Sequence, residues 1–299
     1  MKRVRVVAVM LALGARVLVS DAHQAGTSGL NTTAIDQALN LPGQMQGDVY
    51  RVSMPRTDLT VTVHGIAIQP GLALGSWAAF RRAGIRTVVH GDLVLTVPEV
   101  NPVISKLQEG GLQITALHNH LMEETPTLMY LHYWGEGASG ALAWALRAAL
   151  QMTKTPLTPE PAPTVGAAPA DPGFDVGAIQ KALGRTGSVR GGVLAISIPR
   201  PEKITMMGVE LPPAMGMSTA LNFQAAGAGK VAATGDFVMV DDEVDPIAKA
   251  LRAHNITVTA LHSHMLHGSP ALYFMHFWAE DTAANVAAGL KAAVDLLAK

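Results

Sequence analysis

Residues 116–126 read ALHNHLMEETP, and residues 260–270 read ALHSHMLHGSP. Each stretch places two histidines one residue apart after a short apolar run. A further histidine follows in each case, at His132 and at His276. The same pattern therefore occurs twice, at a separation of 144 residues. A repeat at a fixed offset indicates an internal duplication of the chain.

The duplication extends well beyond the histidines. Upstream, residues 91–107 read GDLVLTVPEVNPVISKL and residues 235–251 read GDFVMVDDEVDPIAKAL. Between Gly91 and Glu136, 17 of 46 positions are identical to their partners in the second copy. Between the copies lies a stretch rich in proline, alanine and threonine, which is typical of an extended linker. We therefore predict a signal peptide at residues 1–22, a first repeat domain at 31–150, a linker at 151–173 and a second repeat domain at 174–299.

Each copy has the same predicted layout. A short helix is followed by two or three strands, a second helix, two more strands and a final helix. In the first copy we expect strands near 48–54, 60–69, 86–97, 113–120 and 127–134, and later helices at 98–109 and 139–150. This order predicts an α+β fold of two homologous domains, each an antiparallel or mixed sheet with flanking helices, related by a pseudo-twofold duplication. The two copies could pack face to face.

The histidines are placed to converge on one face of a sheet. Residues i and i+2 of a strand point the same way, so His118 and His120 project together. If residues 127–134 pair back as an antiparallel strand, His132 joins the same face. Three neutral imidazoles with an open position are a common layout for catalytic zinc, and they also suit iron, copper or nickel. The second copy repeats the predicted ligand set with His262, His264 and His276.

Two glutamates distinguish the first copy from the second. Glu123 and Glu124 follow the first histidine pair, whereas His267 and Gly268 occupy the matching positions. A carboxylate there could complete a zinc, iron or manganese site, or act as a general base for catalysis. The glutamates could also simply belong to a solvated loop. Equally, the histidines could form a hydrogen-bonded layer shared between the copies instead of metal sites.

Other polar residues recur in both copies. Asp92 and Asp236 each follow a glycine and could accept the second ring proton of a ligand histidine, or belong to a turn. Arg56 and Arg200 could clamp an anionic group or form ion pairs. Two histidines of the first copy have no counterpart in the second, and we treat them as incidental: His64 and His90.

Composition restricts the function. The net charge is −1, only 15% of residues are charged, and there is no cysteine. A nucleic-acid-binding face, disulfides and thiolate metal sites are therefore disfavoured or excluded. The first residues, MKRVRVVAVMLALGARVLVSDAHQAG, combine a basic start, a short apolar run and small residues, which indicates export to the periplasm or medium. A first buried strand of a cytoplasmic protein is the alternative.

The two histidine blocks also resemble a known family. With ALHNHL followed by HYW, and ALHSHM followed by HFW, each preceded by GD and a helix, the chain is similar to the LppY/LpqO family, a duplicated bacterial domain of unknown function (DUF1259-like). The resemblance covers roughly residues 31–299 and implies the two-domain layout and export. Members named as lipoproteins carry a lipidated cysteine, which this chain lacks. The resemblance implies no established activity.

From these observations we predict an exported metal-dependent enzyme, a hydrolase or lyase acting on a small polar substrate. Zinc is the favoured ion, with iron, manganese or copper as alternatives. The second hypothesis is a periplasmic protein that binds a metal or a cell-envelope ligand without turnover. The third is a structural module in which the histidines only pack. A small-molecule or envelope ligand is the expected partner, with no nucleic acid and no stable membrane span.

Overall fold

The computed structural model describes residues 29–159 and 171–297. The predicted signal peptide at residues 1–22 lies outside the described residues, as does the central part of the predicted linker, residues 160–170. Between Leu150 and Val176, the residues that the structure describes form no helix or strand.

Each half of the chain builds a six-stranded sheet, and every strand pair in it is antiparallel. The first sheet has the order β1 (Gln44–Gln46), β2 (Val49–Pro55), β5 (Gly75–Ala83), β6 (Arg86–Thr96), β9 (Leu128–Gly137), β7 (Gln113–His118). The second has the order β10 (Ser188–Arg190), β11 (Val193–Pro199), β14 (Ser218–Gly227), β15 (Lys230–Met239), β18 (Tyr273–Thr282), β16 (Thr257–His262). The predicted α+β duplication is confirmed.

The helices flank the sheets, and short elements fill the connections. The first half has α1 (Thr32–Leu39), α2 (Pro70–Ala73), η1 (Val97–Glu99), α3 (Val100–Glu109) and α4 (Ser139–Leu150). The second has α5 (Val176–Leu183), η2 (Pro213–Met215), α6 (Asp241–Ala253) and α7 (Ala283–Val294). Two three-stranded sheets join β3 (Thr62–Val63) to β4 (Ile66–Ala67) and β8 (Glu124–Thr125), and β12 (Thr205–Met206) to β13 (Val209–Glu210) and β17 (Gly268–Ser269).

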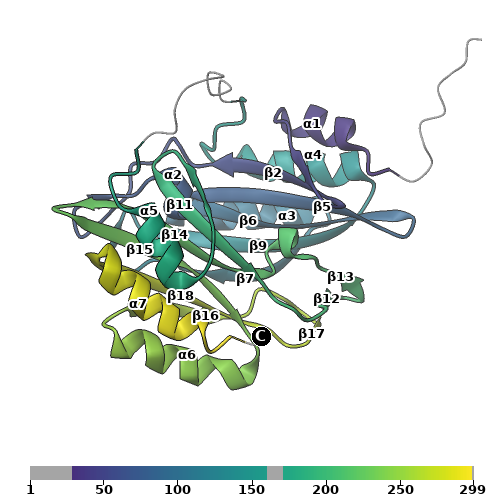
Figure 1. Cartoon of the computed structure of the whole chain (residues 1–299). Helices are drawn as coiled ribbons and strands as arrows, with labels where there is room; N and C mark the ends of the chain where they lie inside the picture. The colour runs from purple at the N-terminus through teal and green to yellow at the C-terminus, as the bar shows by residue number, and fades with distance from the viewer. Residues whose placement is uncertain (1–28, 160–170, 298–299) are drawn as a thin grey trace, which may run out of the picture.

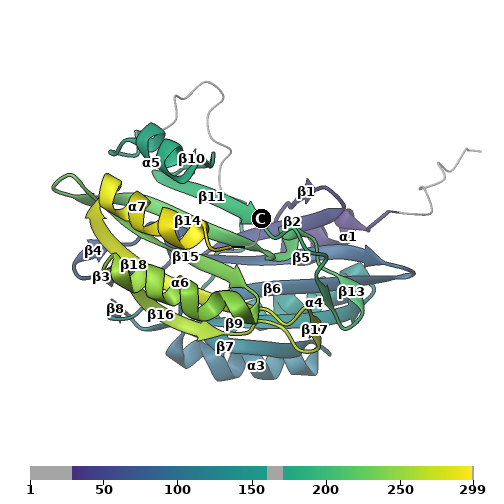
Figure 2. The ribbon, with the colours of Figure 1, turned by 60° about the horizontal axis from the view of Figure 1, so that its bottom comes forward.

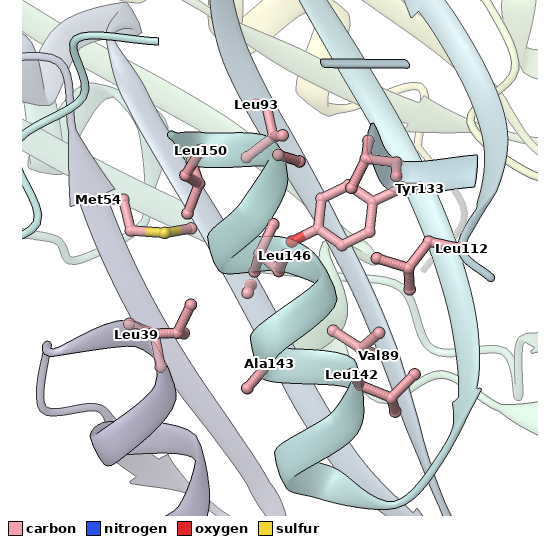
Figure 3. Packing of buried hydrophobic residues seen from close by; sticks show 14 of the residues in the cluster. Leu39, Met54, Val89, Leu93, Leu112, Tyr133, Leu142, Ala143, Leu146 and Leu150 are labelled. Carbon is pink, nitrogen blue, oxygen red and sulfur yellow. The ribbon is translucent and has the colours of Figure 1, made fainter. Parts of the chain in front are cut away.

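The two large sheets face each other and the longer helices cover their outer sides (Figures 1 and 2). Alternation along β9 explains the layering, because successive side chains point to opposite faces of a strand. Leu131 and Tyr133 pack against the helices, where Figure 3 shows Tyr133 beside Leu146 of α4. Trp134 instead packs with buried residues of the second half, including Phe274. The strands are thus buried on both faces, and the molecule has helix, sheet, sheet and helix layers.

Each half also extends a short segment onto the sheet of the other. In the first half, α2 packs on β14 and β15, and the backbone N–H of Gln69 donates to Gln224 at 2.8 Å. In the second half, η2 packs on β2, and Arg51 donates to the carbonyl of Ala214 at 2.9 Å. This exchange encloses the space between the sheets from both sides.

Two strand predictions need correction. The strand predicted at 60–69 is a pair of two-residue strands, β3 and β4, joined by a turn with Gly65 at a φ of 81°. We did not predict β5, whose sequence GSWAAFRRA alternates poorly because both faces of the strand are covered. Its alanines and arginines also have a higher propensity for helix than for strand, so local preference opposes the tertiary structure there.

Candidate metal centre

The hairpin of β7 and β9 brings the first three histidines together as predicted. In the antiparallel register, His118 pairs with Tyr130 and Ala116 pairs with His132. The rings of His118 and His132 are 5.1 Å apart between centroids. His120 follows the end of β7, and its ring stacks on Tyr130 at 3.4 Å. The predicted first set therefore lies on the face of the first sheet that points toward the second.

The second copy repeats this geometry closely. His262 pairs with Phe274 and Ala260 pairs with His276, which places the rings of His262 and His276 5.0 Å apart. His264 stacks on Phe274 at 3.7 Å, just as His120 stacks on the matching Tyr130. The duplicated sequence has therefore kept a duplicated local structure.

The two sets interleave into one cluster between the sheets. The sequence allowed a histidine layer shared between the copies only as a hydrogen-bonded alternative to metal sites, whereas the shared cluster here is built of stacked rings. His118 stacks on His262 at 3.5 Å. His120 stacks on His276 at 3.8 Å, and His132 on His264 at 3.7 Å. A twofold operation that exchanges the halves maps the first pair onto itself and the other two pairs onto each other. The pseudo-twofold axis therefore passes between His118 and His262.

The histidine nitrogens fit a metal centre. The Nε2 atom of every histidine in the cluster is buried and has no hydrogen-bond partner among the described residues. Buried polar atoms are seldom left unpaired, so this many in one place calls for a ligand. One nitrogen per residue lies within 4.8 Å of the others in two groups. The first group is His118, His120 and His132, and the second is His118, His262, His264 and His276.

Burial keeps the imidazoles neutral. Loss of solvation lowers the pKa of His118 to about 4, and that of His262 to about 3 with a further contribution from His118. Desolvation and the neighbouring histidines hold the pKa values of the other four cluster members well below the ordinary value. The neutral imidazole is the form that binds a metal ion, so the cluster is in its ligand form at neutral pH.

Two carboxyl groups adjoin the cluster, one from each half: Asp92 is buried and Asp236 is half-buried. Asp92 lies opposite His132 in the pairing of β6 with β9, and its oxygens lie 3.8 Å from Nε2 of His132 and 3.9 Å from Nε2 of His120. Asp236 lies 4.0 Å from Nε2 of His276. Desolvation raises the pKa of Asp92 to about 8, and desolvation together with Asp92 raises that of Asp236. These distances exceed a hydrogen bond, so the carboxyl groups face the rings without binding them.

The two glutamates lie apart from the histidines. Glu123 has a side chain that is 75% exposed, and it accepts from His64 at 3.0 Å. Glu124 is buried and accepts the backbone N–H of Leu128 at 3.0 Å. Among the described contacts, neither carboxylate reaches a histidine of the cluster. Their predicted role as general base stays a prediction, while Asp92 and Asp236 are the nearer carboxyl groups.

A cavity of about 810 Å³ opens beside the cluster. Both halves line it, with Asp92 and Asp236 and with four of the clustered histidines: His120, His132, His264 and His276. This volume lies in the range of small-molecule sites. The remaining two histidines, His118 and His262, are outside the lining.

Sequence reasoning missed three residues around this cavity. Arg51 and Trp77 line it, and the Arg51 guanidinium lies 3.9 Å from the centre of the Trp77 ring. His90, which we treated as incidental, is fully buried between the rings of Trp77 and His132, and its Nδ1 lies 3.0 Å from the carbonyl of Met215. All three occur in one copy only, so the repeat carried no signal for them.

The recurring arginines form ion pairs rather than a ligand clamp. Arg56 is fully buried and pairs with Asp58 and Glu99. Its counterpart Arg200 pairs with Glu202 and Glu243. Both therefore hold the ends of their sheets together and lie in the structural framework.

A family profile described as "Domain of Unknown Function (DUF1259)" matches the chain twice, over residues 33–152 and 177–296. The chain belongs to the DUF1259 family. Both matched segments span a six-stranded sheet with its helices, so the DUF1259 unit corresponds to one half of the sandwich. No curated protein matches the chain. Within the described residues, no helix combines the length and apolar character needed to cross a bilayer.

Three solved structures show weak likeness to this DUF1259 protein. The trimeric microcompartment shell protein PduB is 11% identical, with 86% of this chain and 89% of that chain covered and a TM-score of 0.21. EtuB from Clostridium kluyveri is 9% identical, with 86% and 91% covered and a TM-score of 0.20. The fused shell protein MSM0275 is 14% identical, with 72% and 86% covered and a TM-score of 0.19. Likenesses at this level carry no argument about fold or function.

Proposed function

We propose that the protein is a metal-dependent enzyme, a hydrolase or lyase that acts on a small polar substrate in the cavity between its two halves. The observation that carries this proposal is the convergence of six histidines, each with a buried and unpaired Nε2, beside a cavity that both halves line. A packed layer of histidines without a ligand would leave these nitrogens unsatisfied, at a cost of about 1–3 kcal/mol each.

The ligands divide into two sets that share the axis of duplication. His118, His120 and His132 would hold one ion, and His262, His264 and His276 a second. His118 also lies within the nitrogen group of the second set, so a single ion bound by both halves is equally compatible. Zinc is the favoured ion because neutral imidazoles in a rigid, cysteine-free site suit it, with iron, manganese or copper as alternatives.

The cavity supplies the rest of a reaction site. When bound, the ion would supply Lewis-acid chemistry at a substrate oxygen. Asp92 is placed to accept or return a proton, because it lines the cavity and lies within 3.9 Å of two predicted ligands. Asp236 offers the same group from the second half. Glu123 and Glu124 remain the alternative bases, reachable only if their loop approaches the cluster.

A binding protein without turnover is the second candidate. His118 and His262 lie outside the cavity lining, so an ion held mainly by them would have no open position toward a substrate in the cavity. Closed sites are typical of structural or storage metals, whereas catalytic sites keep an open position. We further propose export to the periplasm or medium, which rests on residues 1–22 and is tested by fractionation and N-terminal sequencing of the mature protein.

Metal analysis tests the centre itself. Protein reconstituted with excess zinc, iron or copper and then desalted should retain roughly one equivalent of an ion or more. The double variant His118→Ala, His262→Ala should lose it, whereas His64→Ala should not, because His64 lies on the surface away from the cluster. Retention below about 0.2 equivalents for all three metals would overturn both metal-based functions.

Turnover of model substrates separates enzyme from binding protein. The zinc-loaded protein should hydrolyse p-nitrophenyl acetate or p-nitrophenyl phosphate, and Asp92→Asn should reduce that activity by about a hundredfold or more while retaining zinc. Glu123→Gln and Glu124→Gln serve as matched controls. Loss of activity in a glutamate variant with full activity in Asp92→Asn would move the base to the glutamate. Full zinc loading without any turnover would favour the binding protein.

A further inference from the structure

Arg51 lines the cavity, and its guanidinium has no carboxylate partner within 4.0 Å among residues 29–159 and 171–297. Arg51 extends from β2 over the ring of Trp77, and its Nη1 donates to the carbonyl of Ala214 at 2.9 Å. This one bond uses a single donor of a group that carries five. The other donors have no partner among the contacts that the structure describes.

Arg51 is half-buried, and the two buried arginines of the described residues show how a structural arginine is paired in this fold. Arg56 and Arg200 each bind two carboxylates, at distances of 3.1 Å or less for at least one bond to each partner. A buried guanidinium is costly unless it is paired, and this chain pairs both of those. Arg51 departs from that pattern at the point where it lines a cavity. The missing partner is therefore expected to come from a ligand.

Arg51 has no counterpart in the second half, so only the first half contributes this cation to the cavity. The position that matches Arg51 in the second half is Ala195, and the position that matches Trp77 in the strand register is Ala220. The histidines and the two aspartates, by contrast, occur in both halves. An otherwise twofold-related cavity therefore has one cationic end, and a ligand bound there has one orientation.

The fixed position of the Arg51 guanidinium suits the binding of an oxyanion. Trp77 covers one face of the guanidinium and the carbonyl of Ala214 fixes one edge, so the side chain has little rotational freedom left to lose on binding. Burial lowers the pKa of Arg51 to about 10, which leaves it cationic at neutral pH. A planar fork with free donors binds carboxylate and phosphate groups in a bidentate manner.

We propose that Arg51, stacked on Trp77, binds the carboxylate or phosphate group of a small anionic substrate and directs its other end toward the histidine cluster. This inference rests on the proposed function for the identity of the reacting end, but the anion site stands on its own contacts. A cavity of about 810 Å³ limits the ligand to a small molecule.

Anion binding to metal-free protein tests this inference apart from the metal centre. Protein dialysed against a chelator is titrated with inorganic phosphate and, separately, with acetate, while tryptophan emission is followed. We expect a saturable change from Trp77, and calorimetry on Trp77→Phe should still detect binding after the optical signal is lost. The stronger of the two anions indicates whether the substrate group is a phosphate or a carboxylate.

Substitution then assigns the site. Arg51→Met should weaken anion binding by about tenfold or more, and Arg51→Lys, which keeps the charge but not the fork, by a smaller factor. Arg81→Met is the matched control, because Arg81 lies on the neighbouring strand and already pairs with Asp48. It should change anion affinity by less than about twofold. Melting curves and zinc content of each variant report folding and the metal centre separately.

Three outcomes would overturn the inference. These are no saturable anion binding to wild-type protein, equal affinities in wild type and a folded Arg51→Met or Arg51→Lys variant, or an equal loss in Arg81→Met. If zinc does not bind while Arg51-dependent anion binding persists, only the proposed metal function fails. If zinc binds normally and anion affinity does not depend on Arg51, only the substrate inference fails.

Discussion

Replacing His118 by glutamine in the metal-free protein should remove part of its sensitivity to acid. Burial lowers the pKa of His118 to about 4, whereas an unfolded histidine has a pKa of 6.5. Protons therefore bind the unfolded state first as the pH falls through 6.5. The contribution of His118 to stability is close to zero above pH 6.5, and it becomes a growing penalty on the folded state as the pH falls from 6.5 toward 4.

The magnitude follows from the two pKa values. At pH 5 the unfolded side chain is protonated and the folded one is not, so the free energy of unfolding falls by about 1.4 kcal/mol for each of roughly 1.5 pH units, or about 2 kcal/mol. At pH 7 the contribution is close to zero. The loss of stability between pH 7 and pH 5 should thus be about 2 kcal/mol smaller in His118→Gln than in wild type.

Urea denaturation of chelator-treated protein at the two pH values measures this difference. The other histidines of the cluster also destabilise the folded state in acid, whereas Asp92 and Asp236, whose pKa values are raised, stabilise it. All of these groups remain in the variant, so their contributions largely cancel when the variant is compared with wild type. His64→Gln, at an exposed histidine, is the control and should match wild type. An equal acid loss in His118→Gln and wild type would refute the assignment of His118 as a buried neutral histidine.

Three further predictions concern stability. Arg56→Met should lower the free energy of unfolding by about 3–5 kcal/mol, because two partly buried carboxylates lose a fully buried partner. A loss under about 1 kcal/mol in urea denaturation would contradict the stabilising role of this ion cluster. Gly235→Ala places a Cβ 1.8 Å from the carbonyl oxygen of Ala220 and should lower the free energy of unfolding by about 1–3 kcal/mol or more. Gly75→Ala is the control, because a Cβ there meets nothing within 4 Å. Similar melting temperatures for the two variants would be inconsistent with the close strand packing at Gly235. Zinc at a hundredfold excess over Kd should stabilise wild type by about 2.7 kcal/mol in thermal melts at pH 7. His132→Asn should abolish most of that gain, and an undiminished gain would remove His132 from the ligands.

The local structure of the histidine hairpins could be predicted from sequence because strand alternation alone places them. His118 and His132 belong to adjacent antiparallel strands with the register that the short connection imposes. The duplication then assigned the same structure to the second half. What alternation could not supply is the packing of one sheet on the other, which merges two sets into a single stacked cluster.

The nearby carboxyl groups show the same limit. Glu123 and Glu124 are close to the histidines along the chain, but the chain turns them toward His64 and the backbone of Leu128. Asp92 is distant in sequence and adjacent in space because β6 pairs with β9. Residues that occur in one copy only gave no repeat signal. Arg51 could therefore be recognised as a candidate site residue only from its place in the lining of the folded cavity.

Anomalous diffraction at the zinc edge from a zinc-soaked crystal tests the central claim most directly. The metal centre predicts a peak between the β7–β9 and β16–β18 hairpins, about 2.0–2.1 Å from Nε2 atoms of at least three of the clustered histidines. If that density lies in contact with His118 and with histidines of the second half, the two halves form one centre. A fully zinc-treated crystal with no anomalous peak at the cluster, or with zinc bound only to surface residues, would contradict it.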